Sequence, residues 1–160
     1  MASPANSVRI VSGRCSAATA LSIAQAKVGY DFLSAFALGV FCNALVCLAV
    51  WLCFGARSTT DKILAIVPPI TTFVAAGFEH SIANMYFIPV GLWLRQQPQV
   101  LEVAGQSAEQ LADLTWSNFF IGNLLPVTLG NLFGGAIMVA GVYWFVYLRR
   151  PAKDFAPPDD

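Results

Sequence analysis

The chain has 160 residues, of which 57% are hydrophobic and only 11% are charged, and its formal net charge is zero. A soluble domain carries about a quarter of charged residues, so this composition predicts an integral membrane protein with the lipid bilayer as its first partner. The sequence has no basic block or tail, which excludes nucleic-acid binding on electrostatic grounds.

Residues 1–26 form a mildly polar segment in which no domain is visible. Its apolar patch, residues 17–24, is too short and too weakly hydrophobic for a signal-peptide core or a membrane span. The first long apolar segment, residues 32–55, has no charged side chain and is long enough to cross the bilayer as a helix. Asn43 is its one strongly polar side chain and should face protein, as structural glue in the first instance and as a pore residue in the second.

The second apolar run, residues 63–94, is too long for one straight span. Prolines and glycines punctuate it: Pro68, Pro69, Gly77, Pro89 and Gly91. This pattern predicts a discontinuous helix, with two half-spans that meet at a non-helical break around residues 79–83. Backbone groups freed at membrane depth are tolerated only inside protein or beside a watery cavity.

The centre of this run holds the only histidine of the chain, His80, next to an acid, Glu79. Ionisable groups are costly in lipid and usually mark a transport path, so we favour transport over a pair that merely holds two helices together. An enzyme is not indicated, because Ser81 adjoins His80 without paired catalytic groups or an oxyanion motif. One histidine and one acid are too few ligands for a metal, the four cysteines lack C-x-x-C spacing, and no cofactor is predicted.

A polar loop, residues 95–115, precedes the third apolar run. The loop predicts a short helix near residues 107–111, with Ser107 as its cap and Gln110 three residues on. The third run, about residues 118–148, is also overlong. Its predicted polar breaks are Asn123, Pro126, Thr128, Gly130 and Asn131. Gly130 and Gly134 have the G-x-x-x-G spacing that lets two helices approach closely.

Three spans place the loop at residues 56–62 and the C-terminus on one side of the membrane. That side carries the basic residues Arg57, Lys62, Arg149, Arg150 and Lys153. The positive-inside rule therefore predicts a cytoplasmic tail, residues 149–160, in a plasma (inner) membrane protein.

Three long and compositionally unusual stretches are residues 41–51 (FCNALVCLAVW), 77–85 (GFEHSIANM) and 123–131 (NLLPVTLGN), the last followed by Gly134 and Gly135. Together they resemble the formate/nitrite transporter family of monovalent-anion channels, in the family's order and approximate spacing. The resemblance covers residues 24–148. It implies an all-α, aquaporin-like bundle of six spans in two inverted halves, assembled as a pentamer, in which the three spans of this chain match spans 4–6.

The resemblance also implies a pathway for formate, nitrite or hydrosulfide. Its residues are His80 in the break, Lys27 at the outer end of the fourth span, Asn131 in the sixth, and the apolar constrictions Val46 and Phe73. Lys27 attracts the anion, and His80 donates a hydrogen bond or a proton, since imidazole titrates near pH 6.5 in water. Glu79 holds helices or the imidazole in place, and Asn84 satisfies the broken backbone.

The chain departs from the family pattern because only the second inverted half is recognised. Residues 1–26 carry no family motif, residues 27–148 form the membrane domain, and residues 149–160 form the tail. A pore made from one half exposes its polar break to lipid, which is costly. The chain could be a fragment, could join a separately encoded first half, or could pair with itself antiparallel, and we rank the fragment first. The function that we predict is anion transport through a histidine-centred pore. The alternative is a truncated, non-conducting fragment or a membrane subunit that needs a separate first half. A small membrane subunit without transport would not explain the broken helix with His80.

Overall fold

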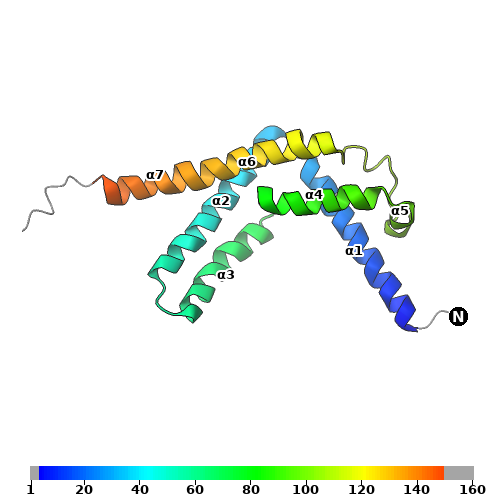
Figure 1. Cartoon of the computed structure of the whole chain (residues 1–160), viewed down its shortest axis with the longest axis horizontal. Coiled ribbons are helices and arrows are strands. Elements are labelled where there is room, and N and C mark those ends of the chain that lie inside the picture. Colours follow the sequence, from blue (N-terminus) through cyan, green and yellow to red (C-terminus); the bar gives the residue numbers. More distant parts are fainter. Residues whose placement is uncertain (1–3, 150–160) are drawn as a thin grey trace, which may run out of the picture.

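The computed structural model describes the backbone of residues 4–149 and the side chains from residue 16 onward. All regular structure in this part is helical, which confirms the predicted all-α class (Figure 1). The first elements are α1 (Pro4–Val28), α2 (Phe32–Gly55), α3 (Thr59–Ala75), α4 (Ser81–Arg95) and α5 (Pro98–Ala104). A long helix follows, in which α-helical and π-helical turns alternate: η1 (Asn118–Leu124), α6 (Leu125–Leu132), η2 (Phe133–Val139), α7 (Ala140–Tyr143) and η3 (Trp144–Leu148).

The helices of the described residues fall into three stretches of chain, which we call tracks (Figure 1). The first is α1 followed by α2, the second is α3 followed by α4, and the third is the long helix from η1 to η3. Helix α1 packs on α4, and α2 packs on α3, α6 and η2. The first two tracks are each interrupted, and the interruptions meet, because Lys27 near the end of α1 contacts Glu79 just before α4. This meeting point positions the site.

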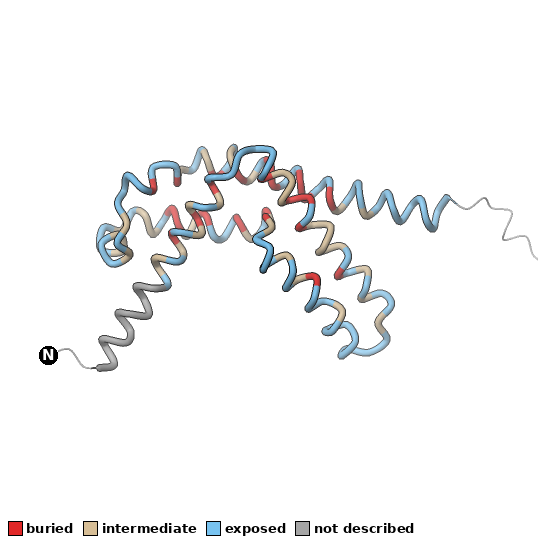
Figure 2. The backbone as a smooth tube through the Cα atoms, turned by 180° about the vertical axis from the view of Figure 1, so that it is seen from behind, coloured by how far each residue is buried: buried red, intermediate tan, exposed pale blue. Residues whose placement is uncertain are grey.

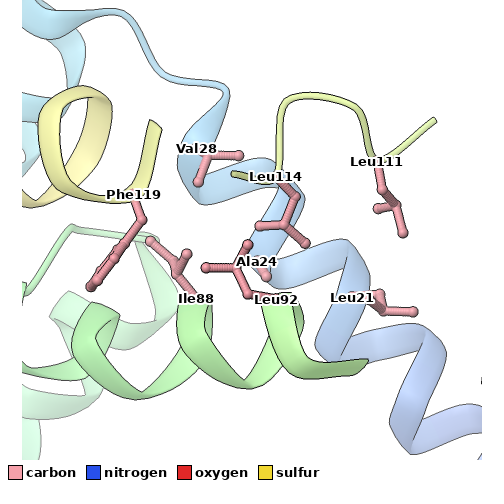
Figure 3. Packing of buried hydrophobic residues seen from close by; sticks show 8 residues of the cluster. All are labelled: Leu21, Ala24, Val28, Ile88, Leu92, Leu111, Leu114 and Phe119. Atoms are coloured by element: carbon pink, nitrogen blue, oxygen red, sulfur yellow. The ribbon is translucent and has the colours of Figure 1, made fainter. Parts of the chain in front are cut away.

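Helix α1 was not predicted, since the patch at residues 17–24 was considered only as a signal-peptide core or a membrane span, and it is too short for either. Its buried positions Leu21, Ala24 and Val28 fall on one helical face, against Ile88 and Leu92 of α4 (Figure 3). The cluster is completed by Leu111, Leu114 and Phe119. The patch is therefore the packing face of a helix rather than a span core.

The second track is discontinuous as predicted, but the break lies at residues 76–80 rather than 79–83. Gly77 ends α3 with a positive φ of 68°, and the amide of Phe78 donates to the carbonyl of Phe73 at 3.0 Å, which is a Schellman ending. The prediction that Pro68 and Pro69 interrupt the run was wrong, because α3 continues through both prolines. Prolines are tolerated in such helices where neighbouring groups satisfy the freed backbone.

Replacing Gly77 with alanine is expected to destabilise the chain by about 1 to 2 kcal/mol, since a Cβ is strained in the left-handed region. The free energy of unfolding of the purified chain in mixed micelles measures this. Gly55→Ala is the matched control, because Gly55 ends α2 without a positive φ and has open space around its Cβ position. Equal effects of the two substitutions would contradict the prediction.

The third track is helical throughout, so the predicted polar breaks between Asn123 and Asn131 do not occur. In place of breaks the track contains π-helical turns, in which each backbone hydrogen bond spans one residue more than in an α-helix. Such turns flank α6 on both sides. The close approach predicted from Gly130 and Gly134 is confirmed: a Cβ at these positions would meet the carbonyls of Phe36 and Val40 on α2.

The loop before the third track contains α5, which lies earlier than the helix predicted at residues 107–111. Ser107 and Gln110 nevertheless form the predicted reciprocal pair, because each side chain accepts from the other residue's amide, at 3.2 Å and 2.8 Å. Residues 108–113 form turns. The reciprocal hydrogen bonds of Ser107 and Gln110 were therefore predicted correctly, but the helix at residues 107–111 was not.

Many large apolar side chains of the described residues are exposed. The buried residues gather where the tracks meet (Figure 2). The helices Phe32–Gly55 and Asn118–Leu148 are long and apolar enough to cross a membrane. Leu33 and Phe54 are 71% and 80% exposed. Apolar surface of this extent calls for lipid or another protein around it.

Candidate functional site

A cluster of buried polar side chains lies where the two interruptions face the third track. Its members come from the break, from α4 and from the long helix, and they are Glu79, Ser81, Asn84, Asn123 and Asn131. Buried polar groups are stable only when they are hydrogen-bonded. The cluster is accordingly a network, and its partners define what it can do.

Glu79 is the centre of the network and is 2% exposed. Its Oε1 accepts from Nζ of Lys27 at 2.8 Å, and its Oε2 accepts from the amides of Asn84 at 2.6 Å and Asn123 at 3.3 Å. Lys27 is 16% exposed, and the ring of Phe87 lies 5.9 Å from its ammonium. The carboxylate thus joins α1, α4 and the third track at one point.

Asn123 was predicted only as a helix break, and its place in the network was missed. Its Nδ2 donates to the carbonyl of Lys27 at 2.7 Å, and its Oδ1 accepts from Asn84 at 2.8 Å. Asn123 precedes Asn131 by eight residues, about two helical turns. This spacing of two asparagines in an apolar run was the signal for a shared buried face.

Asn131 uses both ends of its amide within the protein. Its Oδ1 accepts from the backbone amide and the hydroxyl of Ser81, each at 3.0 Å. Its Nδ2 donates to the carbonyls of Gly39 at 2.9 Å and Glu79 at 3.0 Å. Asn43, on α2, donates to the backbone carbonyl of Asn131 at 2.6 Å.

His80 is the residue that precedes α4 and caps it. Its Nδ1 accepts from the amide of Ile82 at 3.2 Å, which is the bond that a side chain at this position makes to the first turn. A neutral imidazole whose Nδ1 accepts carries its proton on Nε2, so Nε2 is a donor. The ring is half-buried and its centroid lies 6.3 Å from that of Phe73.

The structure brings His80, Lys27, Phe73 and Asn131 into one region, through the contacts of the break and the network. Val46 lies apart from these four residues. It lines an apolar groove of ≈ 410 Å³ between α2 and the third track, together with Trp51, Gly135 and Tyr143. Among the residues that the structure describes, no group of acids, histidines and cysteines could hold a metal ion.

The chain was then compared with known proteins. A sequence model of the family described as Formate/nitrite transporter matches residues 5–145. The chain belongs to the formate/nitrite transporter family. The match includes most of the segment at residues 1–26 that the sequence analysis had set apart from the membrane domain. Membership of this family makes the chain an integral membrane protein.

Individual relatives agree with this assignment. The formate channel FocA of Escherichia coli (strain K12) is 45% identical over 132 residues, which are 81% of this chain and 46% of FocA. A probable formate transporter of Methanothermobacter thermautotrophicus is 47% identical over 130 residues, 80% of this chain and 41% of that protein. These family members are named as channels and transporters, which supports a role other than catalysis.

A solved structure, a pentameric formate channel with formate bound, superposes with a TM-score of 0.75 at 46% identity. The match covers 81% of this chain and 52% of that one. The chain therefore has the fold of one part of a formate channel, and it spans about half the length of the curated relatives that it matches.

Proposed function

We propose that the chain supplies the histidine-bearing half of a pore for small monovalent anions, with formate and nitrite as substrates and hydrosulfide as a further one. The observation that carries this proposal is the capped imidazole: Nδ1 of His80 is held by the amide of Ile82, which leaves Nε2–H as a hydrogen-bond donor at the break of a discontinuous helix. An anion that has lost water in an apolar constriction needs such a donor.

In this state His80 acts by hydrogen bonding. A proton step requires the imidazolium, and a proton on Nδ1 removes the bond to Ile82. The neutral ring instead offers Nε2–H to an oxygen of the anion while Phe73 narrows the path beside it. The second proposed constriction, Val46, belongs to the apolar groove of α2.

Lys27 is proposed to draw the anion toward His80. Glu79 takes one N–H group of its ammonium, an ammonium has three, and the side chain is 16% exposed. Glu79 and Asn84 hold Lys27 and the break in place through the network, while Asn43 ties α2 to the third track. The ion pair with Glu79 is neutral overall, so the attraction that we propose comes from the two N–H groups of the ammonium that Glu79 does not take.

The proposed assembly is a homo-oligomer, a pentamer as in the solved relative, with the rest of each pore wall supplied by a separate first half or a second copy. Residues 27–148 form the proposed membrane domain, and the C-terminal tail is proposed to be cytoplasmic in the inner membrane. The alternative function is that of a non-conducting fragment or subunit, and its support is the share of its relatives that the chain covers, 46% of FocA.

Formate flux into liposomes that contain the purified chain tests the proposal. We expect uptake above that of empty liposomes, and we expect His80→Ala to abolish it, because the Nε2–H donor of the imidazole at the break is lost. Gly141→Ala is the control, since its Cβ position is open, and it should conduct like the parent. Absence of flux from correctly inserted protein would instead support the non-conducting alternative.

A further inference from the structure

We propose that Asn131 is a positioning residue for His80 rather than a ligand of the permeating anion. This inference rests on the proposed function, in which His80 is the donor at the centre of the path. It reassigns the role that the family resemblance gave to Asn131.

Asn131 forms hydrogen bonds to the residues on both sides of His80. Asn131 accepts from the amide of Ser81, the residue after His80, and donates to the carbonyl of Glu79, the residue before it. The two peptide groups that flank His80 are thereby fixed by one side chain. We call this arrangement, with the bond from Asn131 to the carbonyl of Gly39, the Asn131 clamp.

The side-chain amide of Asn131 has all of its hydrogen-bonding positions filled by protein groups. A side-chain amide has two donors and one acceptor oxygen with two lone pairs. Both donors and both lone pairs have protein partners between 2.9 Å and 3.0 Å, and the residue is 7% exposed. An anion would have to displace one of these bonds, whereas the cap of half-buried His80 uses Nδ1 and not Nε2.

Helix α2 has a glycine at the position where it meets the Asn131 clamp. A Cβ at Gly39 would lie 2.8 Å from the carbonyl of Val127 and 3.2 Å from Nδ2 of Asn131. Only glycine therefore lets the carbonyl at position 39 reach the amide of Asn131. The clamp joins α2, the third track and the break. The distance between α2 and the third track therefore affects the orientation of the His80 imidazole.

The test uses the fact that His80 is the only histidine of the chain. The full chain, purified with a histidine-free tag and labelled with ¹⁵N-histidine, is reconstituted in lipid, and its imidazole ¹⁵N shifts are recorded. The parent should show the Nε2–H tautomer. Asn131→Leu should shift the ratio of the two tautomers by about fivefold, the effect of losing one hydrogen bond of ordinary strength.

Two further variants keep the test decisive. Ser81→Pro removes both donors to Asn131 while leaving Asn131 intact; proline is favoured at the first helical position, and His80 already has the extended backbone that precedes proline (φ −116°, ψ 119°). It should reproduce the tautomer shift even if Asn131→Leu does not fold. Val127→Ala is the control for loosened packing on the same helix, because Val127 is buried and apolar, and it should keep the parent spectrum.

The tautomer readout does not depend on whether the chain conducts. Tautomer shifts in the Asn131 and Ser81 variants with a parental spectrum in Val127→Ala support the clamp, even where no variant and no parent transports formate. A parental tautomer ratio in folded Asn131→Leu or Ser81→Pro overturns it. So does a parent chain without the Nε2–H preference.

Discussion

Glu79→Gln is expected to lower the free energy of unfolding by about 3 kcal/mol, one of the largest effects of any single substitution in this chain. The carboxylate is 2% exposed and accepts from Lys27, Asn84 and Asn123. Glutamine has the same shape, but it turns an amide or a neutral oxygen toward the ammonium of Lys27. Removing one partner of a buried ion pair leaves an uncompensated charge, which costs more than the pair contributes.

A double substitution distinguishes the effect of the charge on stability from the effect of side-chain shape. Lys27→Met with Glu79→Gln removes both charges, keeps an oxygen at position 79 for Asn84 and Asn123, and should recover more than half of the stability lost in Glu79→Gln. Unfolding of the purified chains in mixed micelles measures each value. If the double variant is no more stable than the single one, the ion pair is not the source of the effect.

The sequence predicted that the second run is broken near an ionisable centre, although the break lies at residues 76–80 rather than 79–83. Glu79 and His80 stand out because ionisable groups are rare in apolar runs, and Gly77 marks the end of α3 through its left-handed backbone. Pro68 and Pro69 misled the prediction, because a proline removes one backbone donor without ending a helix whose neighbours support it. The position of the break was decided by Gly77 and by the cap that His80 gives to α4.

The partners of the site could not be predicted from local sequence. Asn131 meets Ser81 across 50 positions of the chain, and Asn123 meets Lys27 across 96. Such bonds depend on how the three tracks pack against one another. The pattern of residues within one segment does not contain that information. For the same reason α1 was missed, since its buried residues Leu21, Ala24 and Val28 can be recognised as a packing face only from their contact with α4 (Figure 3).

Gly134→Ala is expected to destabilise the chain by about 2 to 3 kcal/mol, the cost of forcing extra volume into a tight contact. A Cβ at position 134 would collide with the backbone carbonyl of Val40 on α2, and backbone cannot rotate away as a side chain can. The α2 helix must therefore move off the third track, and the carbonyl of Gly39 moves with it. The Asn131 clamp should loosen, so the tautomer ratio of His80 should shift together with stability.

The control substitution, Gly141→Ala, is expected to raise the stability of the chain, whereas Gly134→Ala lowers it. Gly141→Ala lies seven residues further along the same track, where nothing stands within 4 Å of a Cβ. Alanine is favoured over glycine in a helix by about 0.5 to 1 kcal/mol, so Gly141→Ala should stabilise the chain slightly and leave the ¹⁵N spectrum of His80 unchanged. Micellar unfolding and the histidine spectrum of the two variants are compared side by side. Equal effects at both positions would mean that the contact between α2 and the third track does not govern the site.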